Sequence, residues 1–280
     1  MNKNFKKFIP KRIRRTLSSS FLLARNITEP LVRDPLTPPY KLRMLVGPFP
    51  DIHSYKMVQE EFFKYFVELC HITPSERILD VGCGCGQMAA PLTKYLSQAG
   101  LYEGFDINAQ LINWCKKHIS SKYTNFHFEL ADLFSKSYNP KGKYQSSEYK
   151  FPYEKSCFGF AFAKSVFTHM PPKDVENYFS NVSGVLKSGG RCLFSFFLLN
   201  AESSRLMDAG RSTLHFKNDF GQYRTVNADV PEAAVCLDEP LVLGFYEKYK
   251  LIIEKPIRYG SWCGRSSFTS YQDLIIAYKE

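Results

Sequence analysis

Residues 77–86 read RILDVGCGCG, and this stretch decides the predicted fold of the chain. Its first half is an apolar run of strand length, and a helical pattern begins near Gln87 and Met88, directly after the alternating glycines. We therefore expect a buried parallel strand that turns tightly into a helix. Glycines have no Cβ, so the main chain of such a turn can approach a ligand closely, beside the unpaired N–H groups of the helix. A turn of this kind predicts a nucleotide site.

The glycine spacing differs from that of a nicotinamide dinucleotide site. The fingerprint of those sites is Gly-x-Gly-x-x-Gly, whereas here the third glycine comes one position early, at Gly86, and Gln87 occupies the fingerprint position. Taken alone, the glycines leave two interpretations open, namely a cofactor turn or a tight strand-to-helix turn in some other α/β protein. The rest of the chain must separate them.

Two further predicted strands end in acidic residues. The strand over residues 101–105 is followed by Asp106, twenty positions after the last glycine of the turn. In α/β nucleotide sites a carboxylate at about that separation accepts hydrogen bonds from the ribose hydroxyls. The strand over residues 125–130 is followed by Ala131 and Asp132. Ligands of such sheets bind at the carboxyl ends of the strands, so both acids are candidate site residues.

The second half of the pattern repeats the alternation of strand and helix. A fourth strand, residues 157–163, leads into residues 165–170, which read SVFTHM. A helical pattern over residues 172–186 and the turn KSGGR at residues 187–191 then lead to a fifth strand over residues 192–198. This alternation predicts a doubly wound α/β sheet.

Taken in order, these motifs resemble those of the class I S-adenosylmethionine-dependent methyltransferase family over about residues 46–280. The resemblance implies S-adenosylmethionine as the cofactor. It also implies a mostly parallel seven-stranded, Rossmann-like sheet with an antiparallel final strand and substrate-side insertions. We expect residues 46–280 to form the methyltransferase domain and residues 1–45 to form a basic arm with a proline-rich linker.

The same resemblance assigns residues to parts of the cofactor. It places Asp80 and the glycine turn at the amino-acid end, Asp106 at the ribose and Asp132 at the adenine. For either of these last two carboxylates alone, the alternative is a helix cap after a strand. The implied cofactor-binding residues are Asp80, Gly82, Cys83, Gly84, Gly86, Asp106, Ile107, Ala131, Asp132 and Ser165.

Composition bounds the class of protein. With 280 residues, 44% of them hydrophobic, the chain can bury one large core, and no apolar run approaches the length that spans a bilayer. The eight cysteines are spread over predicted strands and helices, which favours a reducing, cytoplasmic location. Cys83 and Cys85 lie close together, but no second ligand pair at zinc-like spacing accompanies them, so we expect no metal.

The formal charge of +10 is concentrated near the start of the chain. Residues 1–50 hold eleven Lys or Arg and two Asp or Glu, whereas the remaining residues hold 26 against 25. The predicted catalytic domain is therefore close to neutral, which disfavours a nucleic acid substrate. We expect a small molecule or saccharide as the partner; the sequence does not indicate an oligomeric state.

The basic arm has three interpretations. It can be a solvated tail, a weak anchor to an anionic membrane surface that would make the protein peripheral to a membrane, or an organellar transit peptide. Prolines at six positions between residues 29 and 51 predict an extended linker after it. An amphipathic helix over residues 55–70 should follow and help to close the cofactor pocket.

Two interruptions of the alternating pattern are candidate substrate-side segments. Residues 135–156 form a polar, tyrosine-containing loop that is too long for a simple connection. Residues 199–239 are mixed in character, and we expect them to roof the acceptor pocket. A helix over residues 240–249 and strands over residues 251–257 and 270–278 should complete the sheet.

His169 is the candidate catalytic residue, because a histidine near the transfer point can take a proton near neutral pH. The alternative is a hydrogen-bonded wall residue. Ser165 and Thr168 are candidates to orient an acceptor hydroxyl. Trp262 and Arg265 suit either a polar ring of the substrate or structural packing.

These observations predict methyl transfer to a hydroxyl of a small molecule or saccharide. One alternative is an RNA or protein methyltransferase, but the Asn/Asp-Pro-Pro-aromatic motif typical of enzymes that methylate base amines is replaced here by AKSV at residues 163–166. The other is a partner protein that binds the cofactor without catalysis, because glycine motifs do not prove turnover.

Overall fold

The computed structural model of the protein describes residues 33–136 and 138–280, so the interpretations of the basic arm at residues 1–32 lie outside it. The helices, including short 3-10 and π segments, are α2 Tyr40–Arg43, α3 Ile52–Glu68, α4 Ala89–Leu92, α5 Ala109–Cys115, η2 Lys116–Ser120, η3 Phe167–His169, α6 Pro172–Val185, α7 Ala201–Asp208, η4 Pro231–Ala233 and α8 Glu239–Lys248. The strands are β1 Arg77–Val81, β2 Leu101–Asp106, β3 Phe126–Leu130, β4 Phe158–Ala163, β5 Leu186–Phe196, β6 Leu198–Leu199, β7 Asn218–Asp219, β8 Tyr223–Thr225, β9 Val235–Asp238, β10 Leu251–Ile253 and β11 Asp273–Lys279.

The main sheet has seven strands in the order β10-β11-β5-β4-β1-β2-β3. Strand β11 runs antiparallel to both β5 and β10, whereas β1 to β5 pair in parallel. This arrangement confirms the predicted doubly wound, mostly parallel sheet with an antiparallel final strand. The chain runs outward from β1 to β3 and then returns to β4 on the other side of β1, and ligands of open α/β sheets bind at such a reversal.

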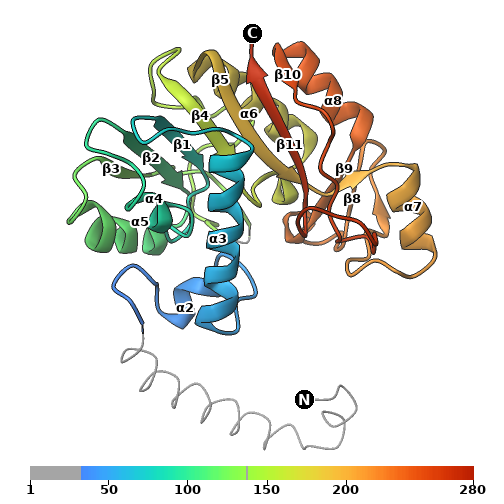
Figure 1. The fold of residues 1–280 in the computed structure, drawn as a ribbon. Coiled ribbons are helices and arrows are strands. Elements are labelled where there is room, and N and C mark those ends of the chain that lie inside the picture. Colours follow the sequence, from blue (N-terminus) through green and yellow to red (C-terminus); the bar gives the residue numbers. More distant parts are fainter. Residues whose placement is uncertain (1–32, 137) are drawn as a thin grey trace, which may run out of the picture.

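The two faces of the sheet carry separate apolar cores, because successive side chains of a strand point to opposite faces. Ile78 of β1 packs in a cluster with Phe62 and Phe66 of α3 and with apolar residues of α4 and α5. Its neighbour Leu79 packs in a second cluster with Val182 of α6 and Val242 of α8. Figure 1 shows α3 and α6 on opposite faces of the main sheet. Strands β1 and β4 are therefore central, with residues 78–81 of β1 and all of β4 buried, and their ends position the site.

The helix after the glycine turn and the fifth strand differ from their predicted bounds. The helix expected after the glycine turn is short, α4 Ala89–Leu92, because residues 82–88 are used to form the turn itself. The fifth strand begins at Leu186 and not at residue 192, with a register shift against β4. The glycines of KSGGR allow this irregular pairing, since Gly189 has a φ of +71°.

The linker predicted to be extended is partly helical. Between Pro39 and Pro48 no proline interrupts the chain, and α2 forms there with Arg43 fully buried. The Nη1 of Arg43 donates a hydrogen bond to the carbonyl oxygen of Pro38 at 2.7 Å. Leu42 of this helix and two apolar residues after it pack in one cluster with Tyr55 of α3 and with the glycine turn. The structure of this segment therefore depends on packing against distant residues as well as on local proline preferences. The domain boundary at residue 45 stays a prediction.

The second interruption, residues 199–239, folds into α7 and most of a four-stranded sheet in the order β6-β9-β8-β7. Figure 1 shows this sheet and α2 beyond the edge of the main sheet where the parallel strands end. None of the helices within the described residues combines the length and the apolarity that a bilayer crossing requires.

Trp262 and Arg265 belong to a buried network around Asp273, so the packing interpretation of these two residues is the one the structure supports. Trp262 is fully buried, and its Nε1 donates to Asp273 Oδ2 at 2.7 Å. Arg265 Nη1 donates to Asp273 Oδ1 at 3.0 Å. The backbone N–H groups of Leu198 and Gly260 donate to the same carboxylate. This network fixes the second sheet to β11.

We expect Asp273→Ala to lower the free energy of unfolding by about 3–5 kcal/mol, because removing one partner of a buried ion pair leaves the other charge uncompensated. Urea denaturation monitored by tryptophan fluorescence measures the change. The matched control is Asp219→Ala, which removes a surface partner of Arg224 and should cost less than about 1 kcal/mol. Equal losses in the two variants would contradict the structural role of the network.

Candidate functional site

A cavity of about 920 Å³ lies at the carboxyl ends of the parallel strands. Its volume is at the upper end of the range of about 300–1,000 Å³ that ligand sites occupy. The glycine turn after β1, the end of β2 and the segment after β4 form its floor. Residues 44–48, the loop after β3 and the insertion with the second sheet complete its walls. The prediction that residues 199–239 roof a pocket thus agrees with the lining of this cavity.

The glycine turn brings the main chain to the wall of the cavity. Gly84 has a φ of +54°, and a Cβ there would lie 2.6 Å from Val46 Cγ1. Gly86 lines neither this cavity nor the smaller one described below. A Cβ at Gly86 would instead lie 2.5 Å from Ile119 Cδ1, so this glycine is required by packing against the end of the helix α5–η2.

Asp106 is held at the cavity wall by two backbone hydrogen bonds. Its Oδ2 accepts from Gly84 N at 2.9 Å, and its Oδ1 accepts from Asn108 N at 2.8 Å. Burial raises the pKa of the Asp106 carboxyl, and the backbone donors partly offset this effect. Each carboxylate oxygen keeps further acceptor capacity, so the fixed group suits a ligand that presents two neighbouring hydroxyls.

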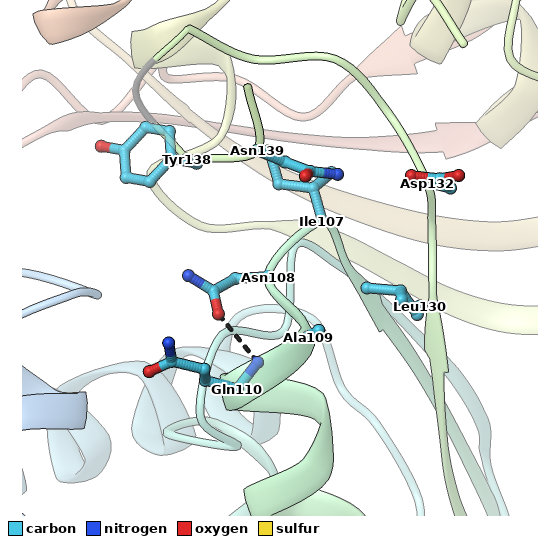
Figure 2. A pocket seen from close by; sticks show the side chains of 8 residues that line it. All are labelled: Ile107, Asn108, Ala109, Gln110, Leu130, Asp132, Tyr138 and Asn139. Carbon is cyan, nitrogen blue, oxygen red and sulfur yellow. Dashed lines mark hydrogen bonds between the residues drawn. The ribbon is translucent and has the colours of Figure 1, made fainter. Parts of the chain in front are cut away.

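A smaller cavity of about 250 Å³ adjoins the end of β2. Figure 2 shows Leu130 and Asp132 on one side of it and the start of α5, with Asn108 bonded to Gln110 N, on the other. Ile107, Asn108 and Tyr138 line this cavity and the larger one, which makes the two adjacent. Ile107 and Leu130 give this small cavity apolar walls, and Asp132 adds a carboxylate, a combination that suits a nucleobase. The Asp132 side chain lies 3.7 Å from Lys143 Nζ.

Asp80 and Lys164 place two ionisable groups in the lining of the large cavity. Asp80 is buried and accepts a hydrogen bond from the hydroxyl of Tyr102. Burial raises the pKa of Asp80 to about 8. Lys164 directly follows β4, and burial lowers its pKa to about 8. Its Nζ donates to Gln87 Oε1 at 3.2 Å.

His169 ends the short helix η3 and lines the large cavity. Its Nδ1 lies 2.7 Å from the carbonyl oxygen of Glu232, and since a carbonyl only accepts, the Nδ1–H donates. The Nε2 of the neutral ring therefore carries the lone pair. Burial lowers the pKa of His169, while the hydrogen bond to the Glu232 carbonyl acts in the opposite direction. The ring of Tyr138 meets it edge-on at 5.7 Å between centroids.

Residues 78–190 match the sequence model of a family described as a methyltransferase domain. The match contains the glycine turn, Asp106, Asp132 and His169, which are the residues that meet around the two cavities. Residues 78–190 therefore carry a methyltransferase domain of this family. The cofactor of this family is S-adenosylmethionine, as the motifs predict.

A curated relative is the ubiquinone/menaquinone biosynthesis C-methyltransferase UbiE of Wigglesworthia glossinidia brevipalpis, which is 27% identical over 148 residues, or 52% of this chain and 52% of that protein. The match thus spans about half the length of the relative. Two solved structures share the fold. The PH0226 protein of Pyrococcus horikoshii OT3 has a TM-score of 0.57 at 14% identity and covers 82% of this chain and 93% of its own. The magnesium protoporphyrin IX methyltransferase of Synechocystis PCC 6803, with bound SAH, has a TM-score of 0.52 at 14% identity. The match covers 85% of this chain and 92% of that structure's chain.

The methyltransferase site gathers most of the residues that the sequence singled out. Those lining the large cavity are Asp80, Gly82, Cys83, Gly84, Asp106, Ile107, Ser165 and His169. Asp132 lines only the small cavity, and Gly86 and Ala131 line neither. Ala131 is buried under the loop after β3, so its side chain packs in the core. The individual roles of these residues stay predictions.

Sequence reasoning missed Lys164 and Asp174 and gave Thr168 only a minor role. Asp174 lines the large cavity from the first turn of α6, and burial raises its pKa to about 6. The hydroxyl of Thr168 is fully buried at the cavity wall and has no hydrogen-bond partner among the described residues. The sequence held one indication that Lys164 belongs to the site, because this single basic residue directly follows the apolar strand FGFAFA, at a strand end where ligands bind.

Proposed function

We propose that this protein transfers the methyl group of S-adenosylmethionine to an oxygen atom of a small hydroxylated molecule. The observation that carries the proposal is the neutral His169, with its Nε2 lone pair available, in the wall of the cavity that Asp106 and the glycine turn also line. An alcohol is a poor nucleophile until its proton is being removed, so such a base favours a hydroxyl acceptor.

The chain would bind the cofactor with its ribose at Asp106 and its adenine in the slot between Ile107 and Asp132. When bound, S-adenosylmethionine supplies a methyl group that its sulfonium already makes electrophilic. The protein therefore has mainly to align the acceptor with the carbon–sulfur bond and to exclude water. Alignment of this kind can lower a barrier by about 7–11 kcal/mol.

The chemistry of the remaining walls indicates the kind of acceptor. Met170, Tyr178, Leu214 and Tyr223 present apolar surface to the large cavity. Polar side chains also line the cavity, among them Gln145, Ser146 and Thr168, and the Thr168 hydroxyl lacks a partner among the described residues. Sites with apolar walls and a few placed polar groups suit small molecules with an apolar frame. This mixed lining suits a small hydroxylated molecule, either one with an apolar frame or a saccharide, better than RNA or a protein segment.

Carbon is the alternative acceptor atom. The matched relative is named a C-methyltransferase, and a neutral histidine can also remove a proton as a carbon–carbon bond forms. The product separates these alternatives, since an O-methyl ether and a C-methyl group give different carbon chemical shifts.

The function can be tested by incubating the purified protein with methyl-labelled S-adenosylmethionine and a panel of phenols, alkyl alcohols, quinols and saccharides. We expect label in O-methyl ethers of the phenols or alcohols, and we expect S-adenosylhomocysteine, but not a nicotinamide dinucleotide, to raise the melting temperature. Label that moves only into RNA or protein from cell fractions would overturn the small-molecule proposal. Binding without any transfer would favour a non-catalytic partner.

A further inference from the structure

Lys164 lies in the wall of the large cavity, and none of the ion pairs found among the described residues includes it. Its Nζ donates a hydrogen bond to the neutral amide of Gln87, while Glu61 and Asp80 attract it without forming such a pair. We propose that Lys164 binds the carboxylate of the amino-acid group of S-adenosylmethionine. This inference rests on the proposed function, because it names a recognition element for the same cofactor.

The position of the ammonium group is fixed by its surroundings. Its Nζ lies 5.6 Å from the centroid of the Phe49 ring and 5.9 Å from that of Phe62. Gln87, which accepts its hydrogen bond, is itself held because its Nε2 donates to Tyr55 O at 3.1 Å. An ammonium group held between two rings and a fixed amide does not need to reorganise when a ligand arrives. A preorganised cation at a cavity wall is suited to bind an anion.

The charges around the cavity show which anion it would bind. Of the described residues that line the cavity, Lys164 is the single Lys or Arg, whereas four are acidic: Asp80, Asp106, Asp174 and Glu232. S-adenosylmethionine carries two positive groups, the sulfonium and the ammonium, and one negative group, the carboxylate. The positive groups have several acidic side chains available, whereas Lys164 is the single Lys or Arg that the described lining offers to the carboxylate. An orientation with the carboxylate at Lys164 therefore places it at the cationic side chain of this lining.

The partner of the ligand ammonium group lies at the same end of the cavity. Asp80 and Lys164 both line the large cavity and attract each other electrostatically, but no ion pair between them is found among the described residues. Burial raises the pKa of Asp80 to about 8 and lowers that of Lys164 to about 8, so burial disfavours the charged form of each group in the unliganded protein. A bound amino-acid zwitterion would compensate both, with its ammonium group toward Asp80 and its carboxylate toward Lys164.

The experiment compares two ligands that differ only in this carboxylate. S-adenosylhomocysteine has it, and S-adenosyl-3-thiopropylamine lacks it. Isothermal titration calorimetry gives the affinity of both ligands for the parent protein and for Lys164→Met, which completes a double-mutant cycle. We expect Lys164→Met to bind S-adenosylhomocysteine about 10- to 100-fold more weakly, the usual loss for a hydrogen bond between charged groups. For the thiopropylamine we expect less than about 3-fold change.

Two further variants serve as controls. Lys173→Met removes an exposed cation from the neighbouring helix α6 and should leave both affinities unchanged. Lys164→Arg keeps the charge and should recover part of the lost affinity. The melting temperatures of the unliganded variants verify that each one is folded.

The outcomes distinguish this inference from the proposed function. Equal weakening of the two ligands by Lys164→Met, or no weakening of either, would overturn the role of Lys164. A raised KM for the acceptor with unchanged S-adenosylhomocysteine affinity would also overturn it and would assign Lys164 to the acceptor instead. Failure of the parent protein to bind S-adenosylhomocysteine at all would reject the proposed function itself.

Discussion

Asp106→Ala is expected to weaken S-adenosylmethionine binding by about 10²- to 10⁴-fold, because two hydrogen bonds between a carboxylate and ribose hydroxyls are lost, each worth about 1.5–3 kcal/mol. The carboxylate is also the acceptor for Gly84 N at 2.9 Å and Asn108 N at 2.8 Å. Its removal therefore loosens the glycine turn as well as the ribose contact. Isothermal titration calorimetry with S-adenosylhomocysteine measures the affinity.

Two other variants control for these separate effects. Asp106→Asn keeps one oxygen acceptor and nearly the same shape, so it should lose less affinity than the alanine variant. Asp219→Ala changes an exposed carboxylate of β7 that lines neither cavity, and this variant should bind as the parent does. If Asp106→Ala bound S-adenosylhomocysteine as tightly as the parent, Asp106 would have no place in the ribose site.

The fold was predictable from the sequence because its signals are local. Apolar runs of strand length, the glycine turn and the acidic residues after β2 and β3 each depend on a few neighbouring residues. The order of these signals limits the topology strongly, since parallel strands joined by helices have few permitted arrangements. The seven-stranded sheet and its antiparallel β11 followed from that order and from the family resemblance.

The environment of Lys164 could not be predicted in the same way. A lysine that ends an apolar strand is usually exposed at its tip, and nothing next to it in the sequence indicates otherwise. The rings that surround it, Phe49 and Phe62, lie about a hundred residues earlier in the chain. The prediction of an extended linker was wrong for a similar reason. Helix α2 packs against α3 and the glycine turn, and this contact between distant residues cannot be predicted from local proline preferences.

The same limit applies to Trp262 and Arg265. An aromatic residue near an arginine suits both a ring-binding site and a buried network, and only the position of Asp273 separates the two cases. Asp273 begins β11, so the network forms only when the last strand enters the sheet. The sequence shows the residue types but not which of them meet.

His169→Ala is expected to lower the turnover number by about 10²- to 10⁴-fold while leaving S-adenosylmethionine affinity nearly unchanged, if the acceptor is a hydroxyl. The reason is the tautomer, since Nδ1–H donates to the Glu232 carbonyl oxygen and leaves Nε2 as the base. His169→Asn tests this directly, because its amide N–H can still donate to that carbonyl but cannot accept a proton at neutral pH. We expect it to be as slow as the alanine variant. His127→Ala, which removes an exposed ring paired with Glu103, should retain full activity.

The pH dependence gives an independent check on the same residue. A base must be deprotonated, so the turnover number at saturating S-adenosylmethionine should fall as the pH drops through the pKa of His169. Because burial lowers this pKa, the fall should lie at lower pH than for an exposed histidine, and it should be absent from the residual activity of His169→Asn. Turnover of both variants within a few-fold of the parent at every pH would show that His169 only forms the wall of the cavity. The acceptor would then have to be nucleophilic by itself, such as a thiolate or a neutral amine, for which alignment alone is sufficient.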